Sequence, residues 1–286
     1  MSRSDPALTR AVKLTRRVSF SAGHRYWLEG LSAQENKKLF GSFASPYNHG
    51  HNYVLDVTIT GTTEKKSGMV VNIKDLDDAV RKKIVSKFDG KSLNDEVSYF
   101  KSRSTSVESI LSYVRVQLEK PKVLPPRTEL IGLRLEETPL LYGELVKDKG
   151  NWKTSITRTY EFAAAHRLHS NHLSDKKNIE LFGKCNNPSG HGHNFVLEVT
   201  VEGTPDKTTG MIADISAIDK VVNKHVVDRY DHKHLNVDIP EFENQVVTSE
   251  ILTNQIFERL DGKLPAKLSR VRLFETARSF FEVTAA

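Results

Sequence analysis

The sequence is poor in sulfur-containing residues and has no long apolar run. Cys185 is the only cysteine among 286 residues, so an intramolecular disulfide is excluded and a reducing compartment is favoured. No stretch approaches the ~20 apolar residues that a membrane-spanning helix needs, and residues 1–17 lack the apolar segment of a secretory signal. We therefore expect a cytoplasmic protein with no membrane partner.

Basic residues exceed acidic ones, but only in one half of the chain. The formal net charge is +6: residues 1–142 hold 23 Lys and Arg against 16 Asp and Glu, whereas residues 143–286 hold 19 against 20. The basic residues are scattered and no aromatic stripe accompanies them, which argues against a nucleic-acid partner. The simpler interpretation is a solvated basic surface. The alternative is a positive field that attracts an anionic small molecule.

One histidine pattern occurs twice in the sequence, with its copies 142 residues apart. Aligned without a gap, residues 20–61 and 162–203 share 20 identities in 42 positions, which indicates a tandem duplication. We therefore predict two domains, at residues 15–146 and 155–286, joined by a polar, turn-rich segment within Gly143–Thr154. The pattern is His24, Phe40-Gly41 and His49-Gly50-His51 in the first copy, and His166, Phe182-Gly183 and His191-Gly192-His193 in the second.

Both copies have the same expected order of elements: strand, strand, helix, helix, strand, strand. Alternating and β-branched residues indicate the strands, and apolar residues at helical spacing indicate the helices, so two small α+β domains are predicted. In the first copy we expect strands near Arg16–Gly23, Asn52–Thr60, Glu129–Glu136 and Leu140–Val146, and helices near Ile73–Phe88 and Ser106–Leu118. In the second copy we expect strands near Ser155–Ala165, Asn194–Glu202, Ser269–Phe274 and Phe280–Val283, and helices at Ile215–Arg229 and from an N-cap at Thr248 to Leu260.

Three histidines of each copy are placed to bind one metal ion. His191 and His193 stand two residues apart at the start of a strand, so their side chains point to the same face of the sheet. His166 ends the preceding strand, which can supply a third nitrogen. Three histidines are a ligand set of catalytic zinc, with the fourth position open to water or substrate. The second candidate site consists of the corresponding first-copy residues His24, His49 and His51.

The second copy also has residues suited to acid–base chemistry, two of which have inert counterparts in the first copy. Cys185 lies in a Gly/Asn/Pro/Ser loop that can carry it toward the metal. Asp231-His232 is a carboxylate–imidazole pair, and an imidazole ordinarily titrates near neutral pH. The first copy has Phe43 at the cysteine position and Gly90 at the histidine position. We therefore place the chemistry in the second copy and expect the first to be an inactive scaffold.

Several motifs of the second copy occur together and point to a known family. They are Phe162-Ala-Ala-Ala-His166-Arg-Leu168, Leu181-Phe-Gly-Lys-Cys185-Asn-Asn-Pro-Ser-Gly-His191-Gly-His193-Asn194, Gly210-Met211, Asp231-His232-Lys233-His234-Leu235-Asn236 and Phe274-Glu275-Thr276. With these motifs, residues 155–286 resemble the family of 6-pyruvoyl-tetrahydropterin and 6-carboxy-tetrahydropterin synthases, which have the tunnelling fold. Residues 15–146 match more loosely, through Phe20-Ser-Ala-Gly-His24-Arg25 and Asn48-His-Gly-His-Asn52-Tyr53.

The resemblance implies a zinc-dependent carbon–oxygen lyase that acts on 7,8-dihydroneopterin triphosphate. It would eliminate the triphosphate and move the reducing equivalents of the ring into the side chain, which gives the 6-pyruvoyl product. Zinc would hold the side-chain hydroxyls and acidify adjacent protons. The residues implied are His166, His191 and His193 for zinc, Cys185 as general base, Asp231 and His232 as proton relay, and Glu275, Thr248 and Glu250 for the pterin.

The resemblance also implies a homo-oligomer. Members of the family have a four-stranded antiparallel sheet and two helices in each unit, build a β-barrel from three units, stack two barrels, and form active sites between neighbours. A chain with two units would then assemble as a trimer that is equivalent to the usual hexamer. Closing the sheets into barrels would remove exposed sheet edges. The expected partners are the pterin triphosphate and further copies of the chain.

The residues leave other functions open. A 6-carboxy-5,6,7,8-tetrahydropterin synthase of the queuosine route would share the fold, but that family commonly has a shorter spacing than the one from Cys185 to His191. A non-catalytic pterin- or zinc-binding assembly protein fits residues 15–146, whereas Cys185, Asp231 and His232 argue against it for the second copy. A zinc hydrolase is disfavoured because no glutamate stands next to the metal ligands.

Overall fold

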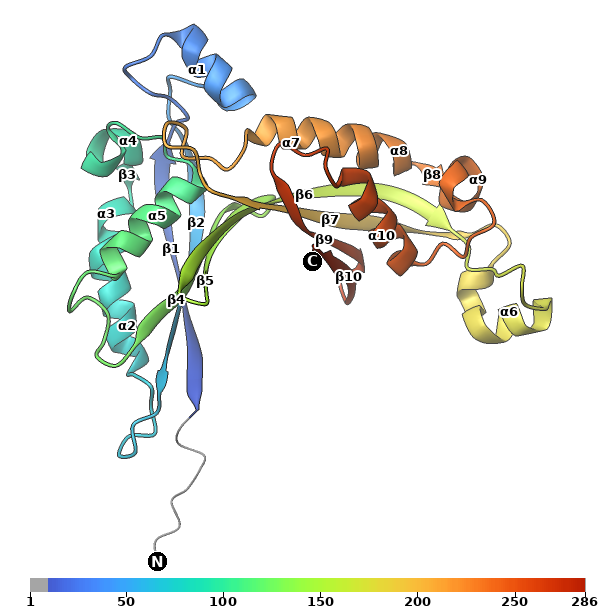
Figure 1. Cartoon of the computed structure of the whole chain (residues 1–286), viewed down its shortest axis with the longest axis horizontal. Coiled ribbons are helices and arrows are strands. Elements are labelled where there is room, and N and C mark those ends of the chain that lie inside the picture. The colour runs from blue at the N-terminus through green and yellow to red at the C-terminus, as the bar shows by residue number, and fades with distance from the viewer. Residues whose placement is uncertain (1–9, 286) are drawn as a thin grey trace, which may run out of the picture. The chain divides into compact units, whose positions relative to one another are not determined.

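The computed structural model describes residues 10–285, which divide into two compact units (Figure 1). Unit 1 runs to Ile156 and also contains Gly203–Asp214, whereas unit 2 contains Thr157–Glu202 and the residues from Ile215 onward. Each unit combines antiparallel strands with helices, so the fold class is α+β, as predicted. Unit 1 therefore holds the first repeat together with one loop of the second.

In unit 1 the long helices and strands follow one another in the predicted order, with short elements between them. The strands are β1 (Ala11–His24), β2 (His49–Thr62), β3 (Lys91–Ser92), β4 (Glu129–Thr138) and β5 (Leu141–Asp148). The α-helices are α1 (Ala33–Phe40), α2 (Ile73–Val80), α3 (Ser86–Phe88), α4 (Leu93–Glu96) and α5 (Val107–Leu118). The 3₁₀ turns are η2 (Gly41–Phe43) and η4 (Ser98–Phe100), and the π-helical turn is η3 (Arg81–Val85).

The second repeat has the same order of elements, and its first strand begins in unit 1. The strands are β6 (Asn151–His166), β7 (His191–Gly203), β8 (Lys233–His234), β9 (Lys267–Thr276) and β10 (Ser279–Thr284). The α-helices are α6 (Asp175–Phe182), α7 (Ile215–Val222), α8 (Asp228–Tyr230), α9 (Leu235–Asp238) and α10 (Ser249–Leu260). The 3₁₀ turns are η5 (Gly183–Asn186) and η7 (Pro240–Phe242), and the π-helical turn is η6 (Asn223–Val227).

The strands of each unit form an open sheet. In unit 1, β1 pairs with β2, β2 with β4 and β4 with β5, all antiparallel, and β3 lies parallel to the end of β1. In unit 2, the neighbours are β6, β7, β9 and β10 in that order, and β8 lies parallel to β6. The pairing of β1 with β2 places His24 opposite His49. The strand order of the described residues does not close on itself, so barrel closure stays a prediction about assembly.

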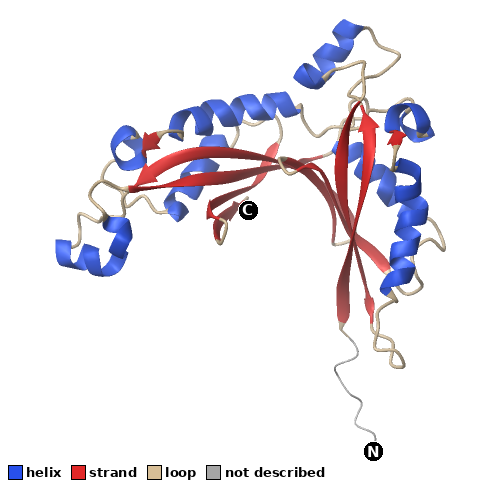
Figure 2. Cartoon of the chain, turned by 180° about the vertical axis from the view of Figure 1, so that it is seen from behind, coloured by secondary structure: helices blue, strands red, loops and turns tan. Residues whose placement is uncertain are grey.

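Alternate side chains of the strands form the core. On β2, Tyr53, Leu55, Val57 and Ile59 are fully buried, as expected when every second residue faces the helices. The long helices of unit 1 lie along one side of these strands (Figure 2). Burial of each such side chain contributes about 1.5–3 kcal/mol to stability. This core holds the strand ends, where the histidines lie, in a fixed register.

The long predicted helices and strands are all present, but the structure adds a helix between the first two strands of each repeat. Ser32 and Glu35 form a capping box at the start of α1, and Gly41 ends that helix with a φ of +56°. The Ser174 side chain caps α6 by accepting the backbone N–H of Lys177, without a capping box, and Gly183 ends the helix with a φ of +50°. Both helices have recognisable sequence signals, a serine before the first turn and a glycine after the last. None of the helices within residues 10–285 is both long and apolar enough to cross a membrane.

Candidate active site and metal centre

Three histidine side chains of unit 2 converge where β6 ends and β7 begins. His166 is the last residue of β6, and His191 and His193 lie at the start of β7. Each offers one ring nitrogen, and these nitrogens lie within 4.8 Å of one another. The Nδ1–H of His166 donates to the carbonyl oxygen of Val247 at 2.8 Å, which leaves Nε2 with a free lone pair. The structure thus brings together the three histidines that the sequence marks as a metal site.

This triad has the chemical properties that a metal ion requires. Nε2 of His166 and Nε2 of His193 are buried and have no hydrogen-bond partner among the described residues. Burial lowers the pKa of His166 to about 4, so its imidazole is neutral at pH 7. A buried nitrogen without a partner is costly, and a bound cation would remove that cost. The three nitrogens fit zinc, with the Val247 carbonyl as the outer contact that fixes the His166 ring.

A cavity of about 530 Å³ opens beside this triad. Cys185, the free thiol, is half-buried on the 3₁₀ turn η5 and lies at the cavity wall. A thiol and carboxylates among apolar walls suit proton abstraction from a bound organic substrate. The cavity is lined by Leu168, Lys184, Cys185, His191, His193, Thr248, Ser249, Glu250, Glu275 and Phe281.

The Glu275 carboxylate lies between the triad and the cavity. Its Oε1 is 3.7 Å from Nε2 of His166 and 3.7 Å from Nε2 of His193. The same oxygen accepts a hydrogen bond from Oγ of Ser249 at 2.7 Å. The neighbouring Thr248 caps α10 by accepting a backbone N–H with its side chain. A carboxylate held in this way can accept hydrogen bonds from N–H donors of a ligand in the cavity.

Asp231 and His232 form a hydrogen-bonded pair that lies outside the Cys185 cavity. The Asp231 carboxylate accepts the backbone N–H of Ala163 at 2.8 Å and Nδ1–H of His232 at 2.7 Å. The bond from Ala163, and after it the bond from His232, lowers the pKa of Asp231. The His232 side chain is 84% exposed and lines a different cavity of about 530 Å³. Within one chain, therefore, the expected relay pair and Cys185 line separate cavities.

The backbone of His232 has a conformation that is rare for residues other than glycine. Its φ is +56°, in the left-handed region. The corresponding residue of the first repeat, Gly90, has a φ of +69°. The fold therefore imposes this geometry on both repeats, and the histidine adopts it at a cost of about 1–2 kcal/mol. A side chain that is present despite such a cost points to a functional role.

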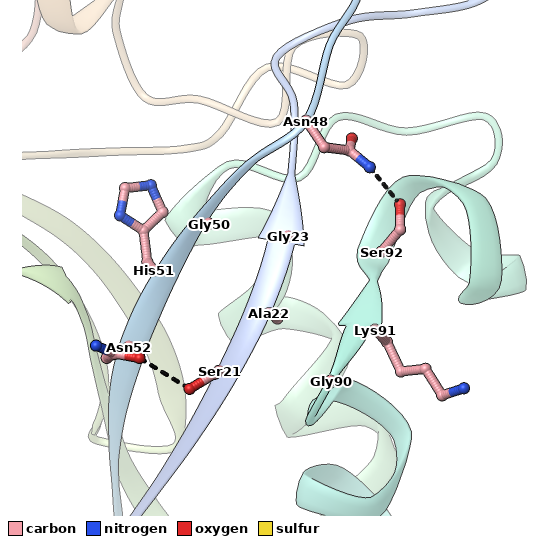
Figure 3. Close-up of a pocket in the computed structure, with 10 residues that line it drawn as sticks. All are labelled: Ser21, Ala22, Gly23, Asn48, Gly50, His51, Asn52, Gly90, Lys91 and Ser92. Atoms are coloured by element: carbon pink, nitrogen blue, oxygen red, sulfur yellow. Dashed lines mark hydrogen bonds between the residues drawn. The ribbon is translucent and has the colours of Figure 1, made fainter.

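Figure 3 shows the corresponding cavity of the first repeat, which has Gly90 at the histidine position. The carboxylate of Asp89 accepts the backbone N–H of Ser21 at 2.9 Å, which is the same bond that the second repeat makes. The aspartate thus ties the end of the preceding helix to a strand in both repeats. Only the second repeat has an imidazole beside this carboxylate.

The first repeat has an equivalent histidine triad but no thiol. The ring nitrogens of His24, His49 and His51 lie within 4.8 Å of one another, and Nδ1–H of His24 donates to the carbonyl of Thr105 at 3.1 Å. Burial lowers the pKa of His24 to about 3 and that of His51 to about 4. Phe43 occupies the cysteine position. The triad can hold a metal, but no group at that position can take a proton.

Sequence reasoning missed two polar residues of the cavity in unit 2. Ser249 contacts Glu275, and Lys184 is the cation beside Cys185. Neither belongs to a metal-ligand or acid–base pattern. A comparison of the two repeats could have found them, because the first repeat has Val107 and Ser42 at these positions.

The fold and the site define a duplicated α+β protein with a histidine triad in each repeat that could hold a metal ion, and with a thiol beside the second triad. The family model described as 6-pyruvoyl tetrahydropterin synthase matches residues 13–147 and again residues 155–286. The chain belongs to the 6-pyruvoyl tetrahydropterin synthase family, as its motifs predict.

Individual relatives agree with this assignment. The chain is 44% identical over 125 residues to the 6-pyruvoyl tetrahydrobiopterin synthase of Poecilia reticulata, which covers 43% of this chain and 85% of the relative. It is 41% identical over 125 residues to the synthase of that name from Homo sapiens, covering 43% and 86%. A solved structure of Caenorhabditis elegans 6-pyruvoyl tetrahydropterin synthase is 39% identical, with a TM-score of 0.45, and covers 47% of this chain and 96% of its own. The chain is thus an enzyme, a lyase of the kind that acts on a phosphate-containing substrate.

Proposed function

We propose that the second repeat converts 7,8-dihydroneopterin triphosphate into 6-pyruvoyl-tetrahydropterin, with zinc as cofactor and elimination of triphosphate. The observation that carries this proposal is the single cavity that joins Cys185 and Glu275 to the histidine triad. Relatives named for the pyruvoyl product are 41–44% identical to the chain, whereas a 6-carboxy-5,6,7,8-tetrahydropterin synthase of Haemophilus influenzae is 28% identical over 147 residues. The pyruvoyl reaction is therefore favoured over the 6-carboxy alternative.

The proposed chemistry assigns separate tasks to the triad, the thiol and the carboxylate. His166, His191 and His193 hold zinc, which when bound supplies a Lewis acid for the hydroxyl oxygens of the substrate side chain. Cys185 takes a carbon-bound proton from that side chain, because it is the thiol at the cavity wall. Glu275 accepts hydrogen bonds from the amino and ring N–H groups of the pterin and so fixes its orientation.

Other residues of the cavity position these groups and the substrate. Ser249 holds Glu275 through the 2.7 Å hydrogen bond, and Lys184 supplies a positive charge for the triphosphate. Thr248 and Glu250 stand at the first turn of α10, where Thr248 caps the helix and Glu250 is exposed to the cavity. These contacts would bind the substrate and the transition state through substrate groups that do not take part in the reaction.

Asp231 and His232 complete the proposed machinery as a proton relay. Because they and Cys185 line different cavities of one chain, the relay would act on the cavity of a neighbouring copy. The first repeat, with Phe43 and Gly90 at the corresponding positions, is proposed to be catalytically inactive.

The proposed assembly is a homo-oligomer, a trimer of two-repeat chains. In unit 1, Met211 of the second repeat packs against Tyr26, and Leu39 packs against the same cluster. The residues that would make this contact a second time are Met69 and Leu181, and they are 47% and 65% exposed. The duplicated sequence provides for this contact twice, but a single chain makes it once. We therefore propose that the second contact forms between copies, with the loop around Met69 covering the second repeat of a neighbour.

The product of the reaction tests the proposed function. The zinc-loaded chain is incubated with 7,8-dihydroneopterin triphosphate, and the products are identified by mass spectrometry. We expect 6-pyruvoyl-tetrahydropterin and free triphosphate. A 6-carboxy product with released acetaldehyde would instead support the queuosine-route activity, and bound but unchanged substrate would support a non-catalytic pterin-binding protein.

A further inference from the structure

The first repeat has a buried carboxylate beside its histidine triad. Oε1 of Glu137 lies 3.6 Å from Nε2 of His51, and Oε2 lies 3.8 Å from Nε2 of His24. Both of these histidine nitrogens are buried and have no hydrogen-bond partner among the described residues. Ligand atoms around a tetrahedral zinc, with bonds of about 2.0–2.1 Å, lie roughly 3.3 Å apart. The two distances from Glu137 to the imidazoles exceed this spacing by only a few tenths of an ångström.

The equivalent carboxylate of the second repeat has different surroundings. The Glu275 oxygen nearest the histidines accepts the hydroxyl hydrogen of Ser249, and the Glu275 side chain is 24% exposed at the cavity. The first repeat has Val107 at the serine position, which has no hydroxyl to donate, and the Glu137 side chain is only 5% exposed. Glu137 therefore lies as close to its triad as Glu275 does to the other one, but in more deeply buried surroundings.

A loop of the second repeat packs beside the triad of the first repeat within unit 1. Met211 from this loop packs against Tyr26, which lies beside the triad. The carboxylate of Glu108 accepts the backbone N–H of Ile212 at 2.9 Å and is 3% exposed, while its second-repeat counterpart Glu250 is exposed. The first-repeat counterparts of Ser249, Glu250 and Glu275 are therefore buried, whereas His49 of the triad is exposed.

We propose that Glu137 is the fourth ligand of a closed metal centre formed with His24, His49 and His51. A site with four protein ligands and no open position is structural, and zinc is the divalent cation that this donor set suits best. The ion would join β1, β2 and β4. The two repeats would then bind the same metal in different roles: the ion of the first repeat would stabilise the fold, and the ion of the second would take part in catalysis.

Zinc release to a chromogenic chelator tests this proposal on the full chain. We expect two zinc ions per chain, one released quickly and one at least ~10-fold more slowly, because an ion with four protein ligands has no open position at which a chelator can attack. Glu137→Gln keeps the size of the side chain and should speed the slow release at least ~10-fold. The matched change Glu275→Gln should leave the slow release unaltered, and His166→Ala should remove only the fast phase.

One zinc per chain, a single release rate, or a slow phase that Glu137→Gln does not change would overturn the proposal. If the Glu137→Gln variant fails to fold, the visible absorption of the wild-type chain loaded with Co²⁺ tests the proposal instead. Added azide is expected to alter the visible absorption of one of the two cobalt ions, and a change in both would overturn the closed centre. Neither measurement uses the pterin substrate, so absent synthase turnover would count against the proposed function alone.

Discussion

At the residue scale, His232 combines a conformational cost with a proposed role in catalysis. Its left-handed backbone costs about 1–2 kcal/mol relative to a relaxed glycine, and part of that is offset by the greater freedom of glycine in the unfolded chain. We expect His232→Gly to leave the free energy of unfolding unchanged or raise it by about 1 kcal/mol. We expect the same change to lower turnover at least ~100-fold, because the relay imidazole is lost. Urea unfolding and steady-state kinetics measure the two effects.

Gly90→His is the matched control for this change. It adds an imidazole at a φ of +69° in the first repeat, so it should lower the free energy of unfolding by about 1–2 kcal/mol and leave turnover unchanged. Wild-type turnover in the His232→Gly enzyme would show that the imidazole has no part in the mechanism.

The residues that could be predicted from the sequence are those with a chemical signature or a repeated spacing. The two triads and Cys185 have such signatures, and the structure gathers the second triad and Cys185 around one cavity. Ser249 has none, because its contribution is a contact with Glu275, which lies 26 residues away in the sequence. The separation of His232 from Cys185 could not be predicted either, since the two residues are far apart in the sequence and no local pattern fixes their relative positions.

At the scale of elements, the loop Gly203–Asp214 depends on a single glycine. Gly210 has a φ of +67°, and an added Cβ would lie 2.0 Å from Oγ of Ser109. We expect Gly210→Ala to lower the free energy of unfolding by about 2–4 kcal/mol, of which about 1–2 kcal/mol is the backbone term and the rest is the clash. Gly262→Ala is the control, because Gly262 has a φ of +68° and nothing within 4 Å of an added Cβ. Equal losses of stability in the two variants, measured by urea unfolding, would show that the loop does not pack tightly.

The elements themselves were largely predictable, because hydrophobic periodicity marks long helices and strands. The short helices α1 and α6 were missed, since each has eight residues and a weak apolar pattern. The docking of Met211 beside Tyr26 could not be predicted, because the two residues belong to different repeats and no local pattern links them.

At the scale of the whole molecule, the exposed Met69 is proposed to make the contact between copies that Met211 makes within unit 1. We expect light scattering to show a trimer for the wild-type chain and smaller species for Met69→Asp, because a buried unpaired carboxylate is costly. Turnover should fall with dissociation. Val116→Asp, which adds the same charge at a 42% exposed position of α5, should leave the trimer intact. A monomeric wild-type chain, or a Met69→Asp trimer, would contradict the proposed assembly.

The proposed chemistry belongs to the second repeat and depends on Cys185. The most direct measurement is the rate at which zinc-loaded Cys185→Ala converts 7,8-dihydroneopterin triphosphate, compared with the wild type and with Phe43→Leu at the corresponding position of the first repeat. We predict that Cys185→Ala loses at least ~100-fold in rate while its zinc content stays unchanged, and that Phe43→Leu keeps the wild-type rate within about twofold. A Cys185→Ala enzyme with an undiminished rate would contradict the account.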